Sequence, residues 1–146
     1  MASSFINFKG NGFWIKDNIL NLTLIFLYAK MSEPELPSWA IEFENLIKKN
    51  AAGEFYGFVD LELDLFLTND ERTLLFIKLL DQTIEILSKV ESDLRNTKLY
   101  DSVKNAFVLD GINIEAVRLI KVLEYLKGLV KGEIATNESD PIEYFF

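Results

Sequence analysis

Apolar residues dominate the chain between Trp14 and Met31, and their spacing predicts the first helix. They follow two adjacent stripes of helical period, while Asn18, Asn21 and Tyr28 mark a narrow polar side. A helix that is apolar around most of its circumference must be covered by other elements. We therefore expect this helix to be buried in the core.

A proline-containing segment, residues 33–38, predicts a break after this helix and the start of a second one. Pro37 or Ser38 suits the first positions of a helix, and Gly53 suits the position just after its end. The apolar face of this second helix would consist of Trp39, Phe43, Leu46 and Ile47.

The longest helix is predicted to begin at a capping box. The Thr68 hydroxyl can accept a hydrogen bond from the backbone N–H three residues on, while Glu71 reaches back to the Thr68 N–H. The helical period then continues to about Val90. Because the apolar arc is wide, we expect this helix to be the central one. One face comprises Leu74, Ile77, Leu80, Ile84 and Leu87.

The last helix is expected over about 113–131, with Gly132 at its end. Residues 94–107 have the spacing of a short helix, and Asp110–Gly111 marks a turn that would also fit a small hairpin over 107–114. The predicted buried positions of the last helix are Ala116, Leu119, Leu123, Leu126 and Val130.

At the N-terminus, two aromatic-rich runs flank Lys9-Gly10-Asn11-Gly12, and Asn-Gly between apolar runs is typical of a hairpin. Residues 1–12 should form a hairpin or an extended arm, and residues 133–146 a tail that ends in Tyr144-Phe145-Phe146. The length of 146 residues and the 49% apolar content suit one core. The sequence therefore predicts a mainly α fold: a single domain over 1–146, a bundle of about five helices, with a short N-terminal β-hairpin as an option.

The stretch from Gly57 to Arg72 combines acidic charge with strict alternation, because Asp60, Glu62 and Asp64 alternate with leucine residues. Alternation is typical of a half-buried strand. The segment is short and precedes a helix start, so one or two helical turns are an alternative. Either arrangement gathers carboxylates that repel one another unless solvent or a basic partner screens them.

The net charge of −8 is unevenly distributed, since residues 31–72 hold ten Asp/Glu against three Lys/Arg. An acidic field repels phosphate backbones and anionic membrane surfaces. We therefore expect a basic protein partner, and neither a nucleic acid nor a membrane. Polar residues interrupt the apolar run of the first helix, which argues against a membrane span or a secretory signal. The absence of cysteine fits a reducing compartment, and we expect the cytoplasm.

Catalytic residue types are scarce. The chain has no His and no Cys, which removes the commonest general base, the thiol nucleophile and most transition-metal ligands. No phosphate-binding glycine loop is present, and the acidic stretch lacks the Gly and the distal Glu of a calcium-binding EF-hand loop. We expect no enzyme activity, no cofactor and no metal site.

A structural explanation competes for several of the carboxylates. Asp60 can cap a turn, and Asp70 with Glu71 falls in the first turn of the predicted long helix, where the helix dipole favours acids. Only a few of ten carboxylates can occupy helix N-termini, however, so the regional excess still suggests a binding role.

Three segments together resemble a family of small, acidic bacterial proteins encoded beside secreted polymorphic toxins, including those of contact-dependent growth inhibition. The segments are GFWIKDNILNLTL at Gly12–Leu24, the helix start Pro37-Ser38-Trp39, and GFVDLELDLFLTNDER leading into a long helix. The resemblance covers about residues 12–132. It implies an immunity protein that binds and blocks a toxin domain, whereas the candidate contact residues follow from charge alone.

The leading hypothesis is thus stoichiometric binding of a basic toxin domain, such as a nuclease, through an acidic surface. One alternative is a non-inhibitory interaction or regulatory module, including a homo-oligomer, that uses the apolar ends Phe5–Trp14 or Tyr144–Phe146. A carboxylate-metal enzyme is the third hypothesis. The candidate partner-binding residues are Asp60, Glu62, Asp64, Asp70 and Glu71, with Glu33 and Glu35 nearby.

Overall fold

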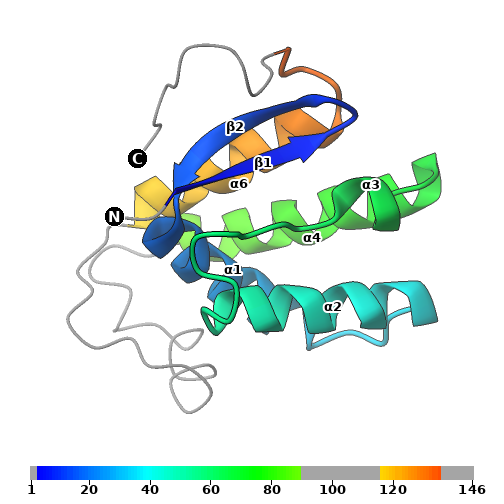
Figure 1. The fold of residues 1–146 in the computed structure, drawn as a ribbon. Coiled ribbons are helices and arrows are strands. Elements are labelled where there is room, and N and C mark those ends of the chain that lie inside the picture. The colour runs from blue at the N-terminus through cyan, green and yellow to red at the C-terminus, as the bar shows by residue number, and fades with distance from the viewer. Residues whose placement is uncertain (1–2, 90–115, 136–146) are drawn as a thin grey trace.

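The computed structural model of the chain describes residues 3–89 and 116–135, and within them the fold is mainly helical with an antiparallel hairpin at the N-terminus (Figure 1). This confirms the predicted fold class. The features predicted for 94–107, 107–114 and Tyr144–Phe146 lie outside the described residues. The elements are β1 (Ser3–Phe8), β2 (Asn11–Lys16), α1 (Asp17–Met31), α2 (Ser38–Ala51), α3 (Leu63–Phe66), α4 (Asp70–Ser88) and α6 (Ala116–Val130).

The hairpin turns at Lys9 and Gly10, whose φ angles of 52° and 84° are the pair of positive values that a tight hairpin turn requires. The Asn11-Gly12 pair, taken from the sequence as the turn signal, instead begins β2, where Asn11 pairs with Phe8. The predicted hairpin is therefore confirmed, and its turn occupies the first two residues of the predicted connection Lys9–Gly12. Its inner face buries Ile6, Phe8, Phe13 and Ile15.

Helix α1 is the most buried element among the described residues. It buries eleven of its fifteen residues and packs against β2, α2, α4 and α6. Helix α4, predicted to be central, buries only five of nineteen, and Leu74 on its predicted inner face is 64% exposed. Helix α1 also begins at Asp17 rather than near Trp14, because β2 continues through Lys16. Trp14 and Ile15 are apolar residues that suit a strand as well as a helix.

Helices α4 and α6 lie side by side, and the hairpin crosses α6 on the other side (Figure 1). The Lys127 ammonium lies 2.8 Å from the Asp81 carboxylate, and this hydrogen bond raises the pKa of Lys127. Phe13 of β2 meets Tyr125 of α6 edge to face at 5.6 Å between ring centroids. The buried positions predicted for the last helix are confirmed: Ala116, Leu119, Leu123, Leu126 and Val130.

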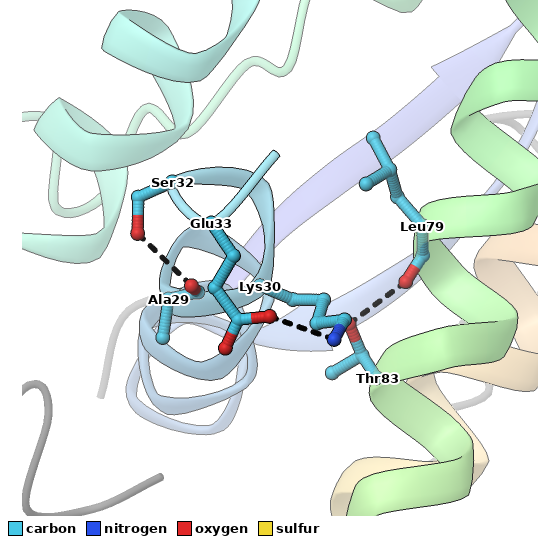
Figure 2. A network of polar contacts seen from close by, with 6 residues as sticks. All are labelled: Ala29, Lys30, Ser32, Glu33, Leu79 and Thr83. Atoms are coloured by element: carbon cyan, nitrogen blue, oxygen red, sulfur yellow. Dashed lines mark hydrogen bonds and ion pairs between the residues drawn. The ribbon is translucent and has the colours of Figure 1, made fainter. Parts of the chain in front are cut away.

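Local polar contacts lie at the C-terminal end of α1 (Figure 2). The Ser32 hydroxyl donates to the Ala29 carbonyl oxygen at 2.9 Å, and the Lys30 ammonium pairs with the Glu33 carboxylate at 2.7 Å. Figure 2 shows the Lys30 side chain extending toward Thr83 of α4, whose hydroxyl donates to the Leu79 carbonyl oxygen. One of the predicted binding carboxylates, Glu33, is therefore engaged in an ion pair.

Helix α4 has a different cap from the predicted one. Asn69 is the N-cap, and its side-chain oxygen accepts a hydrogen bond from the Arg72 N–H at 2.9 Å. The predicted N-cap, Thr68, was therefore wrong by one residue. Thr68 and Asn69 are both good cap residues, and they are neighbours in the sequence. Asp70 and Glu71 still fall in the first turn, as predicted.

Candidate functional site

The most distinctive surface lies on the connection between α2 and α4, and we name residues 54–65 the acidic-aromatic segment. It has no regular structure until α3, although the predicted alternation is kept. Val59, Leu61 and Leu63 are buried, while the residues between them are exposed. The sequence left strand and helix open, and the structure has an irregular chain that leads into one helical turn. Glu62 marks the change of direction with a left-handed φ of 49°.

A fully buried carboxylate, that of Asp17, anchors this segment to the hairpin. Asp17 accepts hydrogen bonds from the Ser4 hydroxyl at 2.7 Å and from the Gly57 backbone N–H. The Ser4 hydroxyl in turn accepts one from the Val59 N–H at 3.1 Å. Gly57 has a φ of 93°, a conformation that residues with a Cβ rarely adopt. Buried hydrogen bonds and a glycine therefore fix the backbone beneath the exposed side chains.

Two further contacts fix the path of the segment. The Asn50 side-chain amide donates to the Asp60 carbonyl oxygen at 3.3 Å, and the Lys9 N–H of the hairpin turn donates to the Asp64 carboxylate at 2.9 Å. The Asp60 carboxylate accepts from the Glu62 N–H at 2.8 Å. Asp60 and Asp64 thus each have a structural role. The Glu62 side chain makes no hydrogen bond or ion pair with any residue in 3–89 or 116–135.

Exposed aromatic residues accompany these acids, and sequence reasoning missed them. Phe58 is 87% exposed, and Phe55 and Tyr56 are also exposed, as is Leu65 at 63%. Large apolar side chains gathered at a surface are a mark of interaction sites. The signal in the sequence was EFYGF at residues 54–58, where three aromatic residues follow no helical or strand period and flank Gly57.

A small groove opens among these side chains. It has a volume of about 110 Å³ and is lined by Leu46, Phe55, Phe58, Asp60 and Glu62. Pockets for small molecules commonly measure roughly 300–1,000 Å³. This groove suits one protruding side chain rather than a cofactor.

The seven predicted binding carboxylates occupy several places, and only Asp60 and Glu62 line the groove. Glu33 and Glu35 lie between α1 and α2, and Asp70 and Glu71 begin α4. The chain carries no Lys or Arg between Lys49 and Arg72, although six acidic residues fall there. The segment therefore carries its charge without a cation of its own.

Within the described parts of the chain, no three carboxylates are placed to share a metal ion. None of the described helices is both long enough and apolar enough to cross a membrane.

Comparison of the chain with protein families, with curated proteins and with solved structures finds no match.

Proposed function

We propose that this chain is an immunity protein, which binds a cognate basic toxin domain in a stoichiometric complex and neutralises it. The observation that carries the proposal is the acidic-aromatic segment, where exposed rings and carboxylates share one rigidly anchored surface. Aromatic residues dominate the energetics of protein interfaces, and the surrounding charges select the partner. The sequence resemblance to immunity proteins of polymorphic toxins supports the same function.

Charge favours a nuclease as the toxin. A nuclease active site must be basic to hold phosphates, and an acidic protein can take the place of the substrate's charge. Opposite charges also steer the two proteins together and speed association at low salt. Rapid capture suits an inhibitor that must reach the toxin before its substrate does.

The direct test is co-expression with the toxin domain encoded beside this gene. Cells that carry the chain should survive the toxin, and the two proteins should co-purify in a fixed ratio. Equal survival of cells with and without the chain would refute the proposal.

Charge reversal at one residue tests the surface. Glu62→Lys should slow association with the toxin several-fold at low ionic strength and little at high salt, since screening weakens the field. Glu124→Lys on α6, which is exposed and far from the segment in sequence, is the matched control. Equal association rates for the two variants would remove the acidic-aromatic segment from the interface.

A second candidate function, a non-inhibitory or self-associating interaction module, is favoured by one feature of the hairpin. Phe5 and Trp14 pair across its strands at 5.5 Å between ring centroids, and both are only partly buried. Light scattering of the wild type and of Phe5→Ser distinguishes the two functions. A dimer that Phe5→Ser converts into a monomer would favour self-association, whereas a monomeric wild type favours the inhibitor.

A further inference from the structure

The groove of the acidic-aromatic segment has walls of two kinds. Leu46 of α2, Phe55 and Phe58 supply apolar surface, while Asp60 and Glu62 supply carboxylates. Long cationic side chains match such a site, because their methylene stems pack on apolar surface and their heads remain with the charges.

Arginine fits these walls better than lysine does. A guanidinium group is planar, stacks on aromatic faces and donates two parallel hydrogen bonds to one carboxylate. An ammonium group is more strongly hydrated and lacks this geometry. The Glu62 carboxylate makes no hydrogen bond with the described residues, and Asp60 uses one oxygen to hold the Glu62 N–H. Carboxylate oxygens therefore remain available at the groove.

The backbone beneath the groove is held in place by contacts within the chain itself. The Phe58 N–H donates to the Phe55 carbonyl oxygen at 2.8 Å, so one turn fixes the backbone between the two aromatic residues. The backbone on either side is held by the buried Asp17 and by Asn50. A backbone that is already fixed adds little to the loss of conformational entropy on binding.

We infer that this groove binds an arginine side chain presented by the partner protein. The inference rests on the proposed function for the nature of the partner, and it names the side chain that the acidic-aromatic segment recognises. Charge complementarity supports this occupant, because the chain has no cation of its own between Lys49 and Arg72.

The probe is a set of three short acetylated peptides that differ only at a central Arg, Lys or citrulline, the neutral isostere of arginine. Each is titrated into the full-length, ¹⁵N-labelled protein. The Arg peptide should shift the amide signals of Phe58, Asp60 and Glu62 with a Kd of about 1 mM, the range expected for one side chain. The Lys peptide should bind about threefold to fivefold more weakly, and the citrulline peptide should cause no shift.

Two variants and one control locate the effect. Glu62→Gln keeps the shape of the side chain and should weaken the Arg peptide about tenfold, the loss of one charge-assisted hydrogen bond. Phe58→Ala should reduce the preference for Arg over Lys, because the guanidinium loses one aromatic face and keeps its paired hydrogen bonds to the carboxylate. Glu124→Gln on α6 should change neither result.

Four outcomes would overturn the inference. They are equal binding of the Arg and citrulline peptides, shifts confined to other amides, no shift at about ten times the expected Kd, and an unchanged affinity in Glu62→Gln. Concentration-dependent shifts of the same amides without peptide would place a second copy of the chain in the groove and would also overturn it.

Protection of cells from the toxin tests this inference separately from the proposed function. If the Phe58→Ala, Glu62→Gln double variant still protects cells fully, the groove is not the recognition site and the immunity function stands. If the wild type fails to protect, the immunity function falls, while the peptide titration still decides whether the groove binds arginine.

Discussion

Two acidic regions of this molecule look alike in sequence and differ in structure: the acidic-aromatic segment and the N-terminus of α4. At α4, Asp70 and Glu71 lie in the first helical turn, and Asn69 caps the backbone behind them. Negative charge is favourable there because it offsets the helix dipole. In the acidic-aromatic segment, the Glu62 carboxylate lies beside exposed rings and makes no hydrogen bond or ion pair with the described residues.

The difference shows which carboxylates need a function to explain them. Folding accounts for Asp70 and Glu71 through the helix, and it accounts for Asp60 and Asp64 through their backbone hydrogen bonds. It does not account for Glu62 or for the exposure of Phe58. An excess of acidic residues in the sequence therefore indicates a candidate binding region. The exposed apolar side chains beside some of these acids then indicate which part of the region is the candidate site.

The largest effect is expected from Asp17→Ala, which removes the anchor of the acidic-aromatic segment. The Ser4 hydroxyl and the Gly57 N–H would lose their buried acceptor, and the free energy of unfolding should fall by about 3 kcal/mol. Urea denaturation measures this change. Hydrogen exchange should also accelerate at Gly57 and Val59 more than at the start of α4. A loss below about 1 kcal/mol would mean that the carboxylate does not hold the segment.

Phe58→Ala should separate binding from stability. Because Phe58 is 87% exposed, the free energy of unfolding should change by less than about 0.5 kcal/mol. Affinity for the toxin domain should fall by about 2 kcal/mol, as at an interface hot spot. Leu74→Ala, at a comparably exposed position on α4, serves as the control and should leave affinity unchanged. Calorimetric titration of both variants tests the pair.

At α4, Asn69→Ala should lower the free energy of unfolding by about 1 kcal/mol through loss of the cap. Thr68→Ala should have almost no effect, because the Asn69 side chain and not the Thr68 side chain accepts from the Arg72 N–H. Thermal unfolding of the two variants compares the neighbouring positions directly. A larger loss of stability in Thr68→Ala than in Asn69→Ala would instead support the capping box predicted at Thr68. Neither substitution should alter toxin binding if the two acidic regions differ as described.

The smallest effect concerns Glu44 on α2, a carboxylate outside both regions. Burial raises the pKa of Glu44, and Lys48 opposes this. A raised pKa in the folded state means that Glu44 favours folding at acid pH and that this contribution is lost as the pH rises through that pKa. Glu44→Gln should therefore stabilise the fold slightly at neutral pH, by less than about 0.5 kcal/mol because water screens the site. The gain should vanish near about pH 3. Equal gains at both pH values would exclude the charge as the cause.

Periodic elements were predictable from sequence, and contacts between distant residues were not. Helices α2 and α6 followed from their apolar spacing and from Gly53 and Gly132, which both have positive φ just after a helix. These signals are local, so they survive without tertiary information. The burial of Asp17 was missed because its partners Ser4 and Gly57 lie thirteen and forty positions away.

The candidate site was predicted in part for the same reason. Alternation correctly placed Asp60, Glu62 and Asp64 on the outside. The exposure of Phe55 and Phe58 was missed, since an apolar residue is assigned to the core by default and only the completed packing shows which ones remain outside. Whether these side chains contact a partner stays a prediction.

The bond between Ser4 and Val59 joins residues fifty-five positions apart. Such long-range contacts form late, after the cost of closing a large loop of chain has been met. The surface above Gly57 should therefore be absent from a nascent or partly folded chain and from an excised peptide of residues 54–65. Only the fully folded chain would then present this surface and compete for the partner.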